Sequence, residues 1–342
     1  MWETVTSLLW YQQRTFDPSQ WCHTGKSLPQ YLLQCCSLRL PHSLLLALSS
    51  LLLFSGMEVV VAAASRRWSR TYQRTLNAED RFRWANKIVC SIHAIVVTTV
   101  ALWVALYTEG VFPRDGQFAF GHSMDAEYLF MLSCGFFIYD TGSAFLHARI
   151  APVAPSMIAH HLASLVGVTY CAAYRVGIAT TVGFLLTEFT TPFLQLRWLL
   201  SKMGYSTKDP LFLVNGIFII VCFFFARIVG SFWLCYDLYK NFDEWLLEPV
   251  YVIFPVLVPV VLAILNVYWY KVIIQLAFRP NRDSGSGKGR PQKKERSPEG
   301  KDIPEKATTV TSTRKSQKPG QEVRMRPTNS EVELENEATT NT

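Results

Sequence analysis

The stretch APSMIAHHLASLVGVTYCAAY, residues 154–174, decides the fold and raises the question of function. It is long and apolar enough to cross a bilayer, which takes roughly 20 predominantly apolar residues in a helix. Yet two adjacent histidines, His160 and His161, lie about two helical turns from its start. Ionisable groups are costly inside a bilayer and usually face the interior of a helix bundle or a water-filled cavity. The pair therefore indicates a polar chamber beside this helix.

Similar apolar stretches repeat along the chain and are separated by short polar loops. Charged residues make up 17% of the chain, below the roughly 25% usual for soluble domains. We predict an all-α polytopic membrane protein with about seven transmembrane helices, at residues 43–64, 86–108, 127–148, 155–174, 178–200, 211–235 and 249–276. Residues 1–42 form an N-terminal extension without an interpretable pattern, and residues 43–79 hold the first span and a basic loop. The polar, Gly- and Ser-rich residues 278–342 predict a disordered tail.

Basic residues alternate between the two sides of the predicted bundle. The loop after the first span contains Arg66, Arg67, Arg70, Arg74, Arg81, Arg83 and Lys87. The next loop has Arg114 as its one basic residue. Because positively charged loops stay in the cytosol, we expect a lumenal N-terminus and a cytosolic C-terminus. The basic start of the tail either rests on anionic lipid or is simply solvated. No folded basic surface indicates a nucleic-acid partner.

Ionisable and polar side chains from several spans fall at one depth when each is counted from the cytosolic end of its span. At ~1.5 Å per residue they lie roughly 8–15 Å below the cytosolic surface. This layer comprises His160, His161, Asp140, Glu188, His93, Asn266 and Glu58. Ser164 shares a helix face with His160, and Gln195 shares one with Glu188. Arg227 counts to the outer half of its span and is expected to lie apart from the layer.

Such a layer suits proton transfer or nucleophilic chemistry, because histidine serves as base, acid or acyl acceptor. Neighbouring helix positions differ by ~100°, so one histidine would meet the substrate while the other meets a carboxylate, Asp140 or Glu188. The candidate catalytic residues are His160, His161, Asp140 and Glu188, and the candidate polar lining is His93, Asn266, Ser164 and Gln195. The alternative is that these groups only hydrogen-bond helices together. No HxxxH or HxxEH spacing is present, so we predict no metal.

Six motifs share a resemblance with one family. The motifs are SIHAIVV, FFIYD, HHLAS, TEFTTPFLQLRW, NGIFIIVCFFFARI and LNVYW, and in this order they resemble the TLC (TRAM, Lag and CLN) domain over about residues 80–277. The resemblance implies a six-helix membrane barrel made by the second to seventh spans, with the first span peripheral. The family includes ceramide synthases, which transfer an acyl chain from acyl-CoA and whose paired histidines match His160 and His161. Their second acidic motif is not matched, since Glu188 is the one acid in LTEFTTP.

Two classes of function follow from the residues and the resemblance. The first is an enzyme that modifies a membrane lipid, with acyl-CoA as co-substrate and no other cofactor. The second is a non-catalytic regulator of membrane lipid composition, or a cargo receptor or chaperone of the early secretory pathway. The resemblance implies the endoplasmic reticulum, and a homo-oligomer is compatible with either class. An ion channel is disfavoured, because the sequence has no repeated pore loop or ring of charges.

Overall fold

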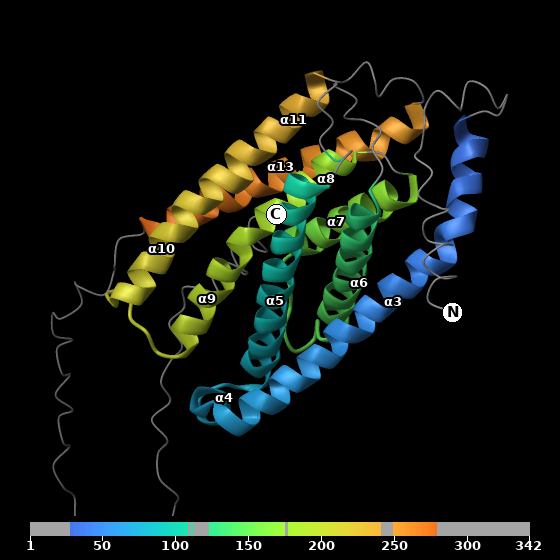
Figure 1. Ribbon diagram of the computed structural model, residues 1–342. Coiled ribbons are helices and arrows are strands. Elements are labelled where there is room, and N and C mark those ends of the chain that lie inside the picture. The colour runs from blue at the N-terminus through green and yellow to red at the C-terminus, as the bar shows by residue number, and fades with distance from the viewer. Residues whose placement is uncertain (1–27, 109–110, 112–122, 175–176, 241–248, 279–342) are drawn as a thin grey trace, which may run out of the picture.

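The computed structural model describes residues 28–108, 111, 123–174, 177–240 and 249–278 (Figure 1). Most of the expected N-terminal extension and nearly all of the expected tail lie outside these residues. Every regular element in the described part of the chain is helical. This confirms the prediction of an all-α polytopic membrane protein.

Six helices among the described residues are long and apolar enough to cross a membrane. They are α3 (Leu28–Trp68), α5 (Ala78–Tyr107), α6 (Met124–Leu146), α7 (Pro155–Tyr174), the continuous stretch α10 (Pro210–Phe223), η2 (Phe224–Val229) and α11 (Gly230–Lys240), and α13 (Pro249–Ala277). A short helix, α4 (Arg70–Arg74), joins α3 to α5. Polar side chains cap the helix starts, as at Asn77, whose Oδ1 accepts from the Asp80 N–H at 2.7 Å.

The expected span at 178–200 forms three consecutive segments instead of one long helix. These are α8 (Ile178–Leu186), the 3₁₀ turn η1 (Thr187–Thr190) and α9 (Thr191–Lys202). The cause lies in Pro192, which has no N–H to donate to the Glu188 carbonyl. The Thr191 N–H donates to that carbonyl instead, which tightens the chain to a 3₁₀ turn. The break thus falls at Glu188, in the middle of the segment.

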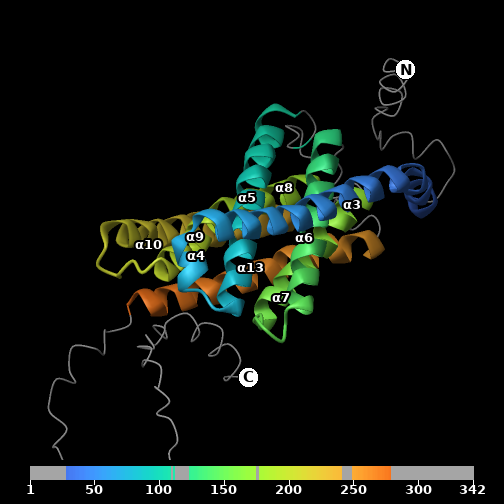
Figure 2. The same ribbon diagram turned by 90° about the horizontal axis from the view of Figure 1, so that it is seen from below.

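Six units follow one another in a closed ring of contacts. Going round the ring, the neighbours in contact are α5, α6, α7, α13, α10–η2–α11 and α8–η1–α9, and the last unit contacts α5 again. Helix α3 lies outside this ring and crosses α5 and α6, which it contacts (Figures 1 and 2). The arrangement agrees with the expected barrel of the second to seventh spans, with the first span peripheral.

Helix α3 packs on α6 at backbone distance. A Cβ added at Gly135 would overlap the Ala47 carbonyl oxygen and would come within 2.7 Å of the Leu51 nitrogen. The Ser50 hydroxyl donates to the Leu132 carbonyl at 2.6 Å across the same contact. Small residues allow such close approach between membrane helices, where van der Waals packing and hydrogen bonds replace the hydrophobic effect.

The outward face of the ring is apolar. Along α10–η2–α11, Ile217, Phe225 and Phe232 are each about 60% exposed. In lipid these side chains need no protein partner, whereas backbone groups must be bonded within the helices. The outer surface therefore fits a hydrocarbon environment, and the polar side chains gather inside the ring.

Candidate functional site

Arg227 is a buried cation inside the ring. It lies in η2, a π-helical segment, and only 4% of the residue is exposed. Its guanidinium donates to four side chains: Thr190 Oγ1 at 2.8 Å, Thr191 Oγ1 at 2.9 Å, Glu188 Oε1 at 3.0 Å and Asn266 Oδ1 at 3.5 Å. Single π-helical turns are frequent at functional sites.

Glu188 is the counter-ion of Arg227. Its Oε1 accepts from Arg227, and its Oε2 accepts from the Thr191 hydroxyl at 2.6 Å. The 3₁₀ turn η1 carries Glu188 and ends beside Thr191, so the chain break caused by Pro192 places both groups on Arg227. The desolvation cost of burying two charges is offset only when the charges are paired and hydrogen-bonded, and both conditions are met here.

The expectation that Arg227 lies apart from the polar layer is wrong. The helical segments extend beyond the predicted spans, to Lys240 in α11 and to Lys202 in α9. Arg227 and Glu188 are therefore both near the middle of their segments, and they meet. A single arginine within a membrane span is by itself a sign of a functional site and of a buried partner. This sign is stronger evidence than the depth of the residue counted along its span.

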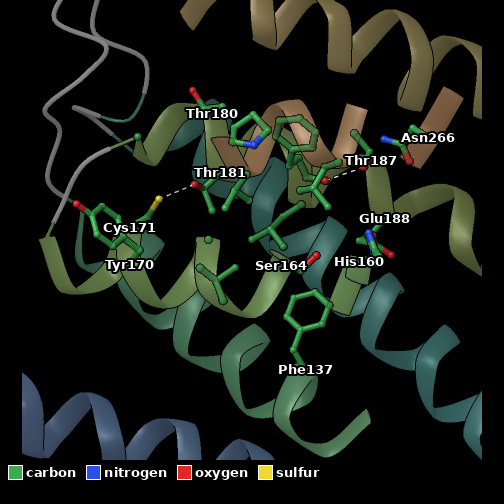
Figure 3. Close-up of a pocket in the computed structure, with 18 of the residues that line it drawn as sticks. Phe137, His160, Ser164, Tyr170, Cys171, Thr180, Thr181, Thr187, Glu188 and Asn266 are labelled. Atoms are coloured by element: carbon green, nitrogen blue, oxygen red, sulfur yellow. Dashed lines mark hydrogen bonds between the residues drawn. The ribbon is translucent and has the colours of Figure 1, made fainter. Parts of the chain in front are cut away.

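An elongated pocket lies inside the ring, between α7, α8–η1 and α13, and Phe137 of α6 and Arg227 of η2 also line it. Its two ends carry different side chains, as Figure 3 shows: Tyr170, Cys171 and Thr181 at one end, and His160, Glu188 and Asn266 at the other. Between the ends the wall is mostly apolar, with Val168, Phe184, Leu185 and Leu262. The empty space is about 670 Å³, its open mouth included.

His160 lines the polar end of this pocket. Its ring meets Trp269 edge to face, with centroids 5.1 Å apart. Its Nδ1 is buried and has no hydrogen-bond partner among the described residues. Asn266, from α13, completes this end: its Nδ2 donates to the Ser231 hydroxyl at 3.0 Å while its Oδ1 faces Arg227. Ser164, one turn along α7 from His160, also lines the pocket.

His161 points to a different partner. Its Nε2 lies 3.3 Å from Asp140 Oδ2, and Asp140 Oδ1 accepts from Asn86 Nδ2 at 2.8 Å. The Cys90 Sγ is 3.8 Å from the same oxygen. Of the two carboxylates considered as partners, Asp140 thus holds a histidine and Glu188 holds Arg227. Phe137, which lines the pocket, has its ring centroid 6.2 Å from that of His161, whereas His161 and Asp140 are not among the described residues that line the pocket.

Three other polar side chains of the expected layer lie outside the pocket. His93 stacks on Phe136, with centroids 3.5 Å apart. Gln195 accepts a hydrogen bond from Lys87 Nζ at 3.2 Å. Glu58, on the peripheral α3, accepts from the Tyr139 hydroxyl at 2.9 Å. Within the described ranges, no group of three or more His, Cys, Asp and Glu side chains is arranged to hold a metal ion.

The family model of the TLC domain matches residues 83–275. The chain belongs to the TLC domain family. The matched range takes in the ring except for the first residues of α5 and the last of α13, and it includes all the residues that line the pocket, whereas α3 precedes it.

Several TLC domain proteins are similar to this chain over much of its length. An uncharacterised TLC domain-containing protein of Schizosaccharomyces pombe is 25% identical over 260 residues, which cover 74% of this chain and 84% of the relative. TLC domain-containing protein 4-A of Xenopus laevis is 28% identical, over 51% of this chain and 67% of its own. Protein CLN8 of Mus musculus is 25% identical, over 66% and 77% respectively. These relatives support a role connected with membrane lipids for this TLC domain protein.

Proposed function

We propose that this TLC domain protein binds a membrane lipid in the pocket inside its ring and so contributes to membrane lipid homeostasis. The observation that carries the proposal is the form of the pocket: an apolar middle that ends in buried polar groups, His160, Glu188, Arg227 and Asn266. A membrane lipid has the same division into an apolar chain and a polar head.

The dimensions support a lipid chain. From His160 to Cys171 the pocket follows α7 for ~16 Å, at ~1.5 Å per residue. Half of a ~30 Å hydrocarbon core is about the same length, so an acyl chain of one leaflet matches it.

Filling the pocket tests the proposal. A Cβ at Gly167 would lie 3.0 Å from Val258 Cγ1 on the pocket wall, so Gly167→Leu is expected to occupy the middle of the pocket and remove bound lipid. Gly142→Leu is the matched control, because a Cβ there meets nothing within 4 Å. Mass spectrometry of the purified variants under native conditions should find a retained lipid in the wild type and in the control, and at least about tenfold less in Gly167→Leu. Equal retention in both variants would contradict the proposal.

The His161–Asp140 pair favours a second candidate function, acyl transfer from acyl-CoA to a lipid alcohol or amine. A carboxylate that holds an imidazole is the arrangement of general-base sites. The acceptor oxygen or nitrogen would attack the thioester carbonyl and the C–S bond would break. A histidine would take the acceptor proton, and coenzyme A would leave as the thiol after receiving it.

Conservative variants test this second candidate. Asp140→Asn keeps the side-chain shape but removes the charge that holds His161, and general-base loss typically lowers rates ~10²–10⁴-fold. Glu58→Gln is the control, since that carboxyl bonds Tyr139 outside the pocket. The readout is acylated lipid formed from labelled acyl-CoA. If turnover survives in both His160→Ala and His161→Ala, acyl transfer by these residues is wrong.

We also propose the endoplasmic reticulum as the site of action, with a cytosolic C-terminus. The basic residues of the connection between α3 and α5 support this orientation. A glycan acceptor sequence engineered into residues 112–122, between α5 and α6, should then be glycosylated, and one engineered into the α3–α5 connection should not. The reverse pattern would contradict the orientation.

A further inference from the structure

The polar end of the pocket also restricts the head group of its ligand. We infer that the pocket takes a single-chain lipid whose head group is uncharged and carries a hydroxyl or carbonyl. This inference rests on the proposed function and names the ligand class within it. Three observations carry it: the charge balance at the polar end, a buried polar atom without a hydrogen-bond partner among the described residues, and the close helix contacts along the pocket.

The charges at the polar end are already balanced. Of the described residues that line the pocket, Glu188 and Arg227 carry the full charges, and they pair with each other at 3.0 Å. The remaining Glu188 oxygen accepts a hydrogen bond from the Thr191 hydroxyl. Arg227 Nε donates to Thr190, and Arg227 Nη2 donates to Glu188 and Thr191. An imidazole such as that of His160 is mostly neutral above pH 7. A phosphate placed here would be a buried charge without a counter-ion, which is strongly unfavourable.

Two polar groups at this end can still form a hydrogen bond with a ligand. His160 Nδ1 is buried without a partner in the described part of the chain, and Arg227 Nη1 makes a single long contact, 3.5 Å, to Asn266 Oδ1. A buried polar atom without a partner is unfavourable, so a ligand group is expected to bond it. A hydroxyl can both donate and accept, and therefore fits either tautomer of His160. A carbonyl fits Arg227 Nη1 as an acceptor.

The helices that line the pocket approach one another closely at two places along its length. At its middle, Gly167 of α7 approaches α13 so closely that a Cβ would be 3.0 Å from Val258 Cγ1. At the end with Tyr170 and Cys171, Thr181 Oγ1 donates to Cys171 Sγ at 3.0 Å, which joins α8 to α7. These contacts hold three of the helices that line the pocket close to one another. This close packing favours one chain over two.

Three probes that share the oleoyl chain test the inference on the full-length protein in detergent. They are monooleoylglycerol, oleoyl lysophosphatidic acid, which adds a phosphate, and dioleoylglycerol, which adds a second chain. Binding is measured by native mass spectrometry with the probes in competition. Monooleoylglycerol is expected to bind at least about tenfold more tightly than either of the others.

A charge variant tests the reason for this preference. Glu188→Gln leaves Arg227 without its counter-ion, so the preference should move at least about tenfold toward lysophosphatidic acid. Glu58→Gln, an identical change outside the pocket, should leave the preference as it is. If Glu188→Gln does not fold, the relative affinities of the wild-type protein for the three probes still test the inference.

The outcomes separate the inference from the proposed function. If the wild type binds lysophosphatidic acid or dioleoylglycerol as tightly as monooleoylglycerol, the restriction on the ligand is wrong while lipid binding stands. If Glu188→Gln folds and keeps the wild-type ranking, charge balance does not select the head group, and the inference is overturned. If no probe binds and no lipid is retained from the membrane, both the inference and the proposed function are wrong.

Discussion

Replacing Arg227 with leucine is expected to lower the free energy of unfolding by about 3–5 kcal/mol, because removal of one partner leaves a buried charge uncompensated. Glu188 would keep one hydrogen bond, from Thr191, and would lose its counter-ion. The hydroxyl of Thr190 would lose the Nε donor at the same time. The effect should be larger than for any single apolar truncation on the outer face of the ring.

The measurement is unfolding in mixed micelles at increasing SDS, followed for a double-mutant cycle. Glu188→Leu should be similarly destabilising, and the double variant Arg227→Leu/Glu188→Leu should recover a large part of the loss, since no charge then remains buried. The exposed Arg70→Leu is the control and should change stability by no more than about 0.5 kcal/mol. Additive losses in the double variant would show that the two residues do not act as a pair.

The second large effect is expected at Gly135, where α3 meets α6. Gly135→Leu would drive a side chain into the backbone of α3 at Ala47 and Leu51, and overpacking of this kind costs about 1–3 kcal/mol or more. This overlap can be relieved by displacement of α3, because this helix lies outside the ring. The α4 connection at its end should then become more accessible to protease.

Gly56→Leu is the matched control on α3 itself, because a Cβ at Gly56 meets nothing within 4 Å. Limited proteolysis at residues 69–77 and the SDS midpoint are compared for the two variants. An unchanged cleavage rate in Gly135→Leu would contradict the tight contact between α3 and α6. Lipid retained in the pocket should survive the displacement of α3, since the residues that line it belong to the ring.

The membrane-spanning helices could be predicted from the sequence because they depend on length and apolarity, whereas the barrel was expected from the family resemblance. Runs such as 86–108 and 211–235 are long enough to span a bilayer, and the structure confirms helices there. The break in the segment 178–200 was missed, although Pro192 indicates it: a residue without an N–H cannot complete the helix at Glu188. The hydroxyls of Thr187 and Thr190, which bond carbonyls within the same segment, accompany this break.

The site depends on information that a single sequence does not contain. The sequence predicts either Asp140 or Glu188 as the partner of a histidine and does not distinguish between them. The choice follows from how α6 packs on α7, which places Asp140 by His161, and from η2, which brings Arg227 to Glu188. Counting the depth of residues along a span does not detect the π-helical turn of η2. His93 and Gln195 count to the right level, but His93 stacks on Phe136 and Gln195 accepts from Lys87, both outside the pocket.

The central claim is that a membrane lipid occupies the pocket inside the ring, and photocrosslinking in native membranes tests it most directly. The photoreactive residue p-benzoylphenylalanine is placed at Phe184, which lines the pocket, and separately at Phe225, which is 64% exposed on the outer face. Mass spectrometry of the crosslinked protein should show one narrow class of lipid at position 184 and the mixed lipids of the membrane at position 225. No lipid at position 184, or the same mixture at both positions, would contradict the account.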